Sequence, residues 1–451
     1  SADNIRHLSK VCYHWRSHDE STASSGTQKT YVFDSAERAI RDAIARRGLS
    51  AEPFLPEIAK RLGLCLNQLR WRAPIGDKRL VTILIPTKDR VDLLERCIDS
   101  VIRTCDRSWA EIVVIDDRSV EAQTLNYFHN IENSSNFSCR VHRPEVIQED
   151  FNYARLINEG VKVVDTPYFL QLNNDVEALD PGWLEDMVGW LSVPGVSVVG
   201  ARLIYPNSSL QHAGVVVGPH HGLADHQFHN LPQQDLGYLG LPHAARNVSA
   251  VTGACMLSTT ECFNNLGGFD EENFAVEYND VDFCLRVMAS GKRIVYTPQA
   301  SLLHVTSASR GKDYDPQEHV NFIKKYKSFV DPFYNVNLSK SSMLMPVSDI
   351  EFSHSHRVTD LRILLISQTL SLTGAPIVAF EYAKSFERDG DFNVTVLALE
   401  DGPMRDEYSA VGIDVVLYDR LDPTLIRSGG LEEALERVDE SLGVRDNFDL
   451  I

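Results

Sequence analysis

The order of apolar and polar positions predicts alternating strands and helices from residue 80 onward. Residues 80–86 form a short apolar run rich in β-branched side chains, residues 91–103 have apolar positions three and four apart, and residues 111–115 form a second apolar run. A strand, a helix and a strand at this spacing are typical of a βαβ unit with two parallel strands. A helix over 152–163 and a strand over 168–172 continue the pattern. We therefore expect an α/β domain.

The pattern on either side of this region predicts different structures. Residues 1–75 are polar and helix-forming, with one helix around 35–44 and a second over 56–69. Residues 326–358 are rich in Ser, Pro and His and are expected to form a linker. The expected parts are a helical N-terminal segment (1–75), the main α/β domain (76–325), the linker (326–358) and a C-terminal part (359–451).

The C-terminal part repeats the strand and helix pattern. An apolar strand is expected at 361–367, a loop at 373–376 opens a helix, and a further strand is expected at 393–399. This order predicts a second βαβ start. Because the last residues resemble the beginning of another strand, the sequence reads as a fragment of a longer chain.

Composition and charge limit the class of protein. With 451 residues, two or three domains are expected. The 43% hydrophobic and 24% charged residues are typical of a folded globular protein. A formal net charge of −19 disfavours a large nucleic-acid footprint, so we expect no nucleic-acid partner. A diphosphate ligand would need a local cation or a few Arg and Lys side chains, because the overall field repels it.

The cysteines and the apolar runs indicate a cytoplasmic location. The eight cysteines form no C-x-x-C motif and lie mostly among apolar neighbours, as expected for reduced core residues. No apolar run approaches the about 18–20 residues of a membrane span, and no signal peptide opens the chain.

Polar residues follow three successive predicted strands, at 86–90, at 116–117 and at 173–175. Ligands of α/β sheets bind at the carboxyl ends of the strands, so we expect these ends to converge on a site. For residues 173–175 (Asn-Asn-Asp) an ordinary turn stays open as an alternative, since Asn and Asp favour turns. Asp180, followed by Pro-Gly-Trp, is assigned to structure as a helix N-cap.

Residues from about 79 to 312 resemble a family-2 glycosyltransferase of the GT-A fold, of the bacterial type that builds surface polysaccharides. The motifs that carry the resemblance occur in order: V-T-I-L-I-P-T-K-D-R, V-V-I-D-D-R-S, F-N-Y-A-R-L-I-N-E-G, Q-L-N-N-D-V-E, L-Q-H-A-G, V-T-G-A-C-M-L, L-G-G-F-D-E-E, E-Y-N-D-V-D-F-C-L-R and L-L-H-V-T-S-A-S-R-G. The resemblance implies a nucleotide-sugar-binding α/β domain with a mixed, mainly parallel central sheet.

The resemblance implies a divalent cation, Mn²⁺ or Mg²⁺, that offsets the charge of a leaving nucleoside diphosphate. Asp175 matches the last position of the family's D-x-D motif, and Asn173 stands where the first Asp usually is. His304 matches a metal or diphosphate ligand, although a lone His is more often packed or solvated. The implied metal ligands are Asp175, His304 and Asn173.

Asp280 matches the family's catalytic base, which would deprotonate the acceptor hydroxyl and invert the anomeric carbon. An acid near a helix start is also favoured by the helix dipole, so a structural role stays open. Asp282 is assigned mainly to structure, because Arg286 lies four residues later and favours an intrahelical ion pair.

The resemblance also implies a nucleotide site, in which the second acid of the D-D pair, Asp117, accepts from the imino N–H of the base. The implied nucleotide-binding residues are Pro86, Thr87, Asp89, Arg90, Asp117, Asn152, Asn158, Asn174 and Arg310. Residues 252–254 (Thr-Gly-Ala) are expected to line the acceptor side, where glycine allows close backbone approach. The His-rich loop 220–229 matches no zinc pattern and is interpreted as a lid or acceptor loop.

We therefore expect an inverting, metal-dependent transferase that moves a sugar from a UDP- or dTDP-linked donor to a growing surface polysaccharide such as an O-antigen or a capsule. The family implies a lipid-linked glycan acceptor, peripheral association with the inner face of the cytoplasmic membrane and other polysaccharide-assembly proteins as partners. The alternative is a degenerate, non-catalytic glycan-binding or scaffolding module, with Asn173 as a sign of lost metal binding. A nicotinamide dehydrogenase is excluded, because no G-x-G-x-x-G follows the first strand.

Residues 361–451 resemble the opening of a family-4 glycosyltransferase of the GT-B fold, on the first strands and the L-T-G-A-P loop. A complete GT-B enzyme needs a second Rossmann-like half to hold its donor. We therefore expect this part to be catalytically silent in the present chain.

Overall fold

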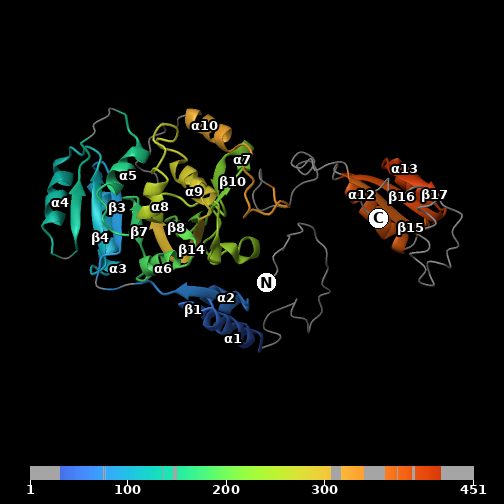
Figure 1. Ribbon diagram of the computed structural model, residues 1–451, viewed down its shortest axis with the longest axis horizontal. Helices are drawn as coiled ribbons and strands as arrows, with labels where there is room; N and C mark the ends of the chain where they lie inside the picture. Colours follow the sequence, from blue (N-terminus) through green and yellow to red (C-terminus); the bar gives the residue numbers. More distant parts are fainter. Residues whose placement is uncertain are drawn as a thin grey trace. The chain divides into compact units, whose positions relative to one another are not determined.

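The computed structural model describes residues 31–74, 76, 78–135, 137–145, 150–305, 316–339, 361–372, 374–388 and 392–417. The chain divides into two compact units near residue 340. The first unit carries the large sheet and the second a small one (Figure 1).

The first unit is built on one mixed sheet whose main path runs β12-β14-β8-β13-β6-β3-β4-β5, with β7 beside β14 and β9 beside β8. The β14–β8, β6–β3, β3–β4 and β4–β5 pairings are parallel, and the β12–β14, β8–β13 and β13–β6 pairings are antiparallel. The predicted fold class, α/β with a mixed, mainly parallel central sheet, is confirmed. The strands are β3 (Val81–Thr87), β4 (Ala110–Asp116), β5 (Cys139–His142), β6 (Tyr168–Leu172), β7 (Val176–Ala178), β8 (Val196–Ile204), β9 (Leu210–His212), β12 (Arg246–Asn247), β13 (Cys255–Thr259) and β14 (Arg293–His304).

Helices cover both faces of this sheet (Figure 1). All residues of β3 and β4 are buried, as expected for parallel strands enclosed on both sides. One apolar core lies under α3 (Val91–Thr104), α4 (Ala122–Glu132) and α6 (Trp183–Leu191). The other lies under α5 (Tyr153–Val161), α8 (Thr260–Asn265), α9 (Asn279–Ala289) and α10 (Pro316–Tyr326).

The described part of the N-terminal segment is not wholly helical, which corrects the sequence prediction. Its elements are α1 (Tyr31–Arg46), β1 (Ala51–Phe54), α2 (Glu57–Leu62) and β2 (Gln68–Trp71). The second helix ends at Leu62 rather than near residue 69, because Gly63 adopts the left-handed conformation (φ 65°) and returns its N–H to the last turn. The chain is then free to pair β2 antiparallel to β1.

The helix expected after Asp180 also begins later than predicted. The N-cap of α6 is Gly182, with φ 89° and no side-chain cap hydrogen bond, and the helix starts at Trp183. Asp180 therefore lies outside the cap, because the left-handed Gly182 turns the chain between Pro181 and the helix.

The beginning of the expected linker packs on the first unit. Asp331 is buried, and its Oδ2 accepts a hydrogen bond of 2.9 Å from the backbone N–H of Val217 in β10 (Val215–Val217). The chain around Asp331 is thus attached to the first unit, while residues 340–358 lie outside the described part. The predicted domain boundaries remain predictions.

The second unit has a parallel sheet in the order β15-β16-β17, with β15 (Leu361–Thr369), β16 (Phe392–Glu400) and β17 (Asp414–Leu417). Its helices are α12 (Gly374–Arg388) and α13 (Met404–Ala410). The predicted strand, helix and strand are therefore present. The resemblance to a GT-B opening remains a prediction.

The described cysteines are free thiols, most of them buried or partly buried. Burial raises the pKa of Cys105 and of Cys139 to about 12, which keeps both thiols protonated and unreactive. Within the described ranges, no helix combines the length and apolarity that a membrane crossing requires.

Candidate active site

Three polar strand ends converge at one edge of the large sheet, as expected from the sequence. Thr87, the last residue of β3, pairs with Asp116, the last residue of β4. Strand β6 runs parallel to β3, and Asn174 beyond its end donates a hydrogen bond of 2.9 Å from Nδ2 to Thr87 Oγ1. The backbone N–H of Asp117 donates to the carbonyl of Thr87. Thr87 thus joins the three strand ends.

Asp175 and His304 are in direct contact although 129 residues separate them. His304 Nε2 lies 3.0 Å from Asp175 Oδ1, and the two residues are only 5% and 6% exposed. The antiparallel pairing of β7 with β14 places His304 opposite Val176, next to Asp175. The sheet therefore brings these two predicted metal ligands together.

The chemistry of this pair fits a small divalent cation. A carboxylate oxygen and an imidazole nitrogen are suitable ligands for Mn²⁺ and, through the oxygen, for Mg²⁺. Within the described residues, no group of three or more His, Cys, Asp or Glu side chains could enclose a metal. Two protein ligands leave other coordination positions to water and to ligand phosphates, as is usual for Mg²⁺ bound with a nucleotide.

Asn173, the third expected metal ligand, takes part in a different contact. Its Oδ1 accepts a hydrogen bond of 2.8 Å from the Tyr153 hydroxyl, which itself accepts one of 2.9 Å from Gln171 Nε2. Asn173 and Tyr153 line a pocket of about 190 Å³ together with Asp280. A metal contact by Asn173 remains a prediction, and its observed role is in the wall of this pocket.

The pocket is bounded by segments that are far apart in the sequence. Its walls are the 252–254 loop, the segment 276–281 that leads into α9, and the hairpin of β10 with β11 (Ala224–His226). Residues 252–254, which were expected on the acceptor side, line this pocket, and their contact with an acceptor remains a prediction. Asp225 and His226 of the His-rich loop also line it, and His226 Nδ1 lies 2.8 Å from Nδ1 of the buried His212.

Asp280 is fixed at the pocket wall by backbone groups. It lies in the first turn of α9, where Oδ2 accepts from the N–H of Gly253 (2.6 Å) and Oδ1 from the N–H of Val281 (2.8 Å). Each carboxylate oxygen has a further lone pair that can accept from a ligand hydroxyl. A Cβ atom at Gly253 would lie 2.3 Å from Gln171 Nε2, so only glycine allows this approach. The arrangement can accept a proton from a bound hydroxyl.

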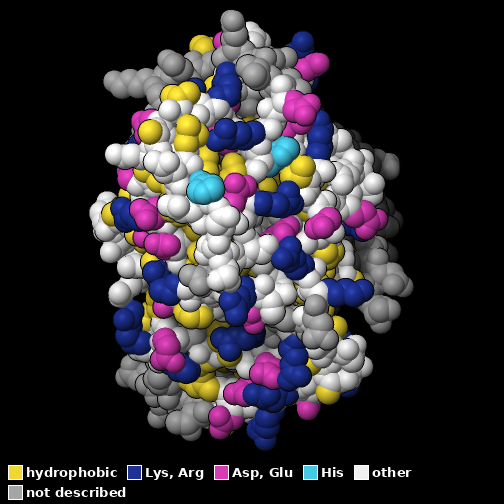
Figure 2. All heavy atoms as spheres, turned by 90° about the vertical axis from the view of Figure 1, so that its left-hand side faces the viewer, with side chains coloured by type: hydrophobic (Ala, Val, Ile, Leu, Met, Phe, Trp, Pro, Cys, Tyr) yellow, Lys and Arg dark blue, Asp and Glu magenta, His cyan; other side chains and the backbone are white. Residues whose placement is uncertain are grey.

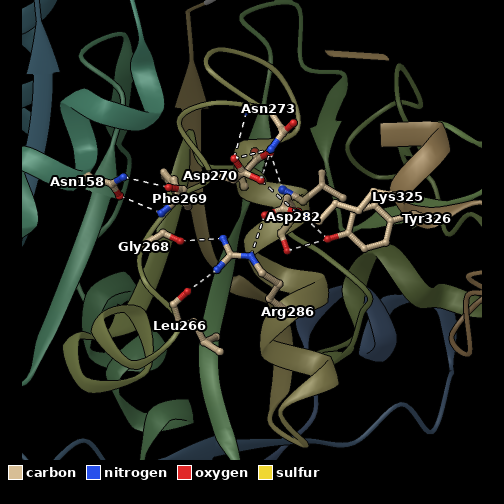
Figure 3. A network of polar contacts seen from close by, with 12 residues as sticks. Asn158, Leu266, Gly268, Phe269, Asp270, Asn273, Asp282, Arg286, Lys325 and Tyr326 are labelled. Atoms are coloured by element: carbon tan, nitrogen blue, oxygen red, sulfur yellow. Dashed lines mark hydrogen bonds and ion pairs between the residues drawn. The ribbon is translucent and has the colours of Figure 1, made fainter. Parts of the chain in front are cut away.

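Asp282 has the structural role that the sequence predicts. It is 0% exposed and pairs with Arg286 (2.8 Å) four residues later, which confirms the intrahelical ion pair. Lys325 Nζ and the Tyr326 hydroxyl, both on α10, each lie 2.6 Å from Asp282 Oδ1 (Figure 3). Burial and the hydrogen bond to Asp282 raise the pKa of Tyr326 well above its usual range. Arg286 also donates to the carbonyls of the 266–268 segment (Figure 3).

A second, smaller pocket of about 40 Å³ lies beside the D-D pair. Asp117 and Asn152, both predicted nucleotide residues, line it with Arg155. The Asp117 carboxylate pairs with Arg118 (2.8 Å), and Asn152 Oδ1 caps α5 by accepting from the N–H of Arg155 (2.8 Å). The structure thus places the two predicted nucleotide residues Asp117 and Asn152 at one pocket.

Two other predicted nucleotide residues make local contacts after β3. Asp89 Oδ1 accepts from the backbone N–H groups of Val120 (2.9 Å) and Glu121 (2.8 Å), just before α4. Arg90 forms two hydrogen bonds of 3.0 Å with Asp92 in the first turn of α3. Asp89 and Arg90 have φ of 52° and 51°, so the chain turns sharply here. These contacts shape the strand end that also contains Pro86, and nucleotide contacts by these residues remain predictions.

Asn158 forms its hydrogen bonds with the 269–271 loop and lines neither of the two pockets described above. Its Nδ2 donates to the Phe269 carbonyl (3.0 Å) and to Glu271 Oε1 (2.7 Å), and its Oδ1 accepts from the Phe269 N–H (2.9 Å). Both ends of the amide thus make structural contacts, and a nucleotide contact by Asn158 remains a prediction. Arg310 lies outside the described residues.

Several residues at the site were not found from the sequence. Gln171 and Tyr153 hold Asn173, Arg143 pairs with Asp116 (3.0 Å), and Gln211 Oε1 lies 2.5 Å from His304 Nδ1. The polar Gln171 inside an apolar strand was an available signal, because an amide is rarely buried without a partner. The other contacts join distant segments and have no local signal.

The charge distribution gives no broad attraction for anions on the face with α3 and α4. Figure 2 shows Lys and Arg side chains interspersed with Asp and Glu there. Several pairs are close, such as Arg96 with Glu177 (2.5 Å) and Arg79 with Glu111 (2.6 Å). A diphosphate would therefore depend on local groups at the strand ends.

Part of the chain matches a known protein family. Residues 82–233 match the family model described as Glycosyl transferase family 2. The chain is 36% identical over 346 residues to an uncharacterized protein, y4gI, of Sinorhizobium fredii (strain NBRC 101917 / NGR234), covering 74% of this chain and 37% of the relative. It is 33% identical over 345 residues to the O-antigen biosynthesis protein RfbC of Myxococcus xanthus, covering 75% of this chain and 26% of the relative.

The chain thus spans between about a quarter and two fifths of the length of these relatives. Among solved structures, that of GalNAc-T7 with UDP, GalNAc and Mn²⁺ aligns with a TM-score of 0.43 at 16% identity, covering 55% of this chain and 48% of that one. The family match and the observed sheet together bear out the α/β class of GT-A type that was expected from the sequence.

Proposed function

Because residues 82–233 form a glycosyltransferase family 2 domain, we propose that this protein is an inverting, divalent-metal-dependent glycosyltransferase. It moves a sugar from a nucleoside-diphosphate donor to a hydroxyl of a growing surface polysaccharide. The observation that carries the proposal is the contact of Asp175 with His304 (3.0 Å). Asp175 follows Asn173 by two residues, and Asn173 lines the same pocket as Asp280.

In the proposed reaction Asp280 is the general base. The acceptor hydroxyl transfers its proton to the Asp280 carboxylate while its oxygen forms a bond to the anomeric carbon. The bond from that carbon to the diphosphate oxygen breaks, and the electron pair leaves with the nucleoside diphosphate. Attack from the side opposite the leaving group inverts the anomeric centre. The Gly253 and Val281 N–H groups hold the carboxylate in place for this transfer.

Asp175 and His304 would hold Mn²⁺ or Mg²⁺. When bound, the ion supplies positive charge to the diphosphate oxygens as the leaving group departs. The protein's own net charge of −19 opposes diphosphate binding, so a local cation is needed. Asp117 and Asn152 line the small pocket that we assign to the nucleoside, with Thr87 and Asn174 between it and the metal ligands.

Three further assignments belong to the proposal. The name of the Myxococcus xanthus relative favours an O-antigen-like product, with a lipid-linked acceptor and partners in polysaccharide assembly. We place the enzyme in the cytoplasm or at the inner face of the cytoplasmic membrane. The C-terminal unit, with its parallel three-stranded sheet, is assigned to a GT-B opening that does not act by itself.

Turnover of nucleotide sugars tests the proposal. The full 451-residue chain is screened with UDP- and dTDP-linked sugars, with Mn²⁺ and after chelation, for release of the nucleoside diphosphate. We expect metal-dependent turnover that Asp280→Ala abolishes. Asp99→Asn, a change on the exposed side of α3, is the matched control and keeps its activity. Equal, metal-independent behaviour of wild type and Asp280→Ala would instead support a non-catalytic glycan-binding module.

A further inference from the structure

Strand β9 contains an irregularity beside His304. Leu203 of β8 pairs with His212 and the next residue, Ile204, pairs with Leu210, so the register shifts and Gln211 is an extra residue. An extra residue of this kind forms a β-bulge, which redirects a side chain and is common next to active sites. Ile204 also pairs with Leu303 of β14, which places Gln211 at the level of His304.

The bulged residue contacts the ring of His304 on the side away from Asp175. Gln211 Oε1 lies 2.5 Å from His304 Nδ1, while His304 Nε2 lies 3.0 Å from Asp175 Oδ1. Both neighbours are oxygen acceptors, whereas a neutral imidazole carries a single N–H. If that N–H is on Nδ1, the Nε2 lone pair faces the Asp175 carboxylate, and a cation bound between them would satisfy both groups.

The orientation of the Gln211 amide decides which nitrogen of His304 carries the proton. An amide has an acceptor end and a donor end, and its orientation follows from its partners on both sides. Burial raises the pKa of Tyr205, and its hydrogen bond with Gln211 acts in the opposite direction. The Tyr205 hydroxyl itself lies 3.1 Å from His229 Nε2. Tyr205 is thus a second partner of Gln211, whose Oε1 is the atom that faces His304 Nδ1.

We propose that Gln211 is a positioning residue for the metal site: it holds the His304 proton on Nδ1 and so keeps the Nε2 lone pair, directed at Asp175, for a divalent cation. The inference rests on the proposed function and adds a residue to it. A histidine that must change its tautomer before binding a metal loses affinity, and loss of such an outer partner typically costs about 10–100-fold. Tyr205 contributes by fixing the amide of Gln211.

Metal affinity measures this role without turnover. Mn²⁺ is titrated into the full chain in the presence of UDP, with a parallel dTDP series, and followed by calorimetry and by the electron paramagnetic resonance of free Mn²⁺. Gln211→Leu is expected to weaken Mn²⁺ binding about 10–100-fold. Gln211→Glu, which still accepts from Nδ1–H, is expected to retain it. Binding of the nucleotide without metal is expected to stay unchanged in both variants.

Two further measurements keep the test decisive. Tyr205→Phe keeps the ring and Gln211 but removes the phenolic oxygen, so it is expected to weaken Mn²⁺ binding in the same direction even if Gln211→Leu fails to fold. Nitrogen-15 chemical shifts of His304 in the metal-free chain are expected to show Nδ1 protonated in wild type. A wild type that binds Mn²⁺ no better than Gln211→Leu and Tyr205→Phe, or a His304 protonated on Nε2 alone, overturns the role of Gln211 only. A wild type that binds no Mn²⁺ overturns the proposed function as well.

Discussion

The carboxylate of Asp280 accepts a hydrogen bond of 2.6 Å from the backbone N–H of Gly253. This contact joins the start of α9 to the loop before β13, and it requires the two segments to approach closely. Gly253 is also where the backbone passes Gln171, whose amide holds Tyr153 and, through it, Asn173. Gly253 thus fixes the position of Asp280, the proposed base, and of the Gln171–Tyr153–Asn173 contacts in the pocket wall.

Replacing this glycine is therefore expected to affect turnover more than folding. In Gly253→Ala the new Cβ would lie 2.3 Å from Gln171 Nε2, so Gln171 must move and the Tyr153–Asn173 contact weakens. A small displacement of reacting groups costs up to about 100-fold, and we expect a loss of about tenfold or more in kcat. Gly76→Ala is the matched control, because a Cβ there meets no atom within 4 Å. Equal kcat for the two variants would contradict the importance of this approach.

Asp175 and His304 are expected to act on one ion. Asp175→Asn and His304→Gln should each reduce Mn²⁺ affinity in the presence of UDP by about 100-fold or more, since each removes one of two protein ligands. If both hold the same cation, the double variant should lose little more than either single variant, because residues that share a partner are not additive. Calorimetric titration of all three variants measures this coupling, and simple multiplication of the two losses would assign the residues to separate sites.

Removal of the metal gives an independent check of the same pair. Wild type treated with a chelator is expected to lose turnover and to regain it with added Mn²⁺ or Mg²⁺. The Asp175→Asn variant should respond only at much higher metal concentration. Turnover that survives chelation would exclude the metal role of this pair while leaving the role of Asp280 open to its own test.

Asp280 and Asp282 are only two residues apart, but we expect a substitution of Asp280 to lower turnover and a substitution of Asp282 to lower stability. Asp282 is fully buried against Arg286, Lys325 and Tyr326, so Asp282→Asn leaves cations without their partner and should cost about 3 kcal/mol of unfolding free energy. Asp280→Asn should leave stability nearly unchanged and lower turnover about 10²–10⁴-fold. Urea unfolding followed by tryptophan fluorescence measures the difference in the first unit, since all tryptophans precede residue 200. Similar urea midpoints for both variants would contradict this division.

The sequence predicts well whatever is local or carried by a family motif. The apolar spacing of residues 91–103 predicts α3, and the polar strand ends predict the convergence that Thr87 and Asn174 display. The meeting of Asp175 with His304 was expected only from the resemblance to the family. Helix α3 and the convergence of the strand ends depend on hydrophobic period and on strand ends, which one sequence records directly.

What could not be predicted depends on contacts between distant segments or on single backbone conformations. The end of α2 follows from the left-handed Gly63, and the pattern of helix formers continues past it. The hydrogen bonds of Asn158 to Phe269 and Glu271 join segments more than 100 residues apart, and no local pattern indicates them. Gln211 reaches His304 through a bulge, which has no signature in the order of apolar and polar residues.

The last prediction concerns a buried acid far from the proposed chemistry. Burial raises the pKa of Asp186 from its ordinary value to about 6, while a hydrogen bond from Thr297 Oγ1 (2.6 Å) and the charge of Arg70 act in the opposite direction. Its Oδ1 has no hydrogen-bond partner within the described ranges. The folded chain therefore holds a proton that the unfolded chain has already lost between about pH 4 and pH 6.

The sign of the effect follows from this difference in bound protons. Because the folded state binds more protons in this window, the contribution of Asp186 to stability falls as pH rises to about 6 and is constant above it. Asp186→Asn removes that contribution, so its unfolding free energy relative to wild type should rise by about 2–3 kcal/mol between pH 4 and pH 7. Urea unfolding at a series of pH values measures the change, and the fixed cost of burying the amide cancels in the comparison. Asp99→Asn, which removes an exposed carboxylate, should track wild type throughout, and a parallel course for Asp186→Asn would show that the acid ionises without cost to the fold.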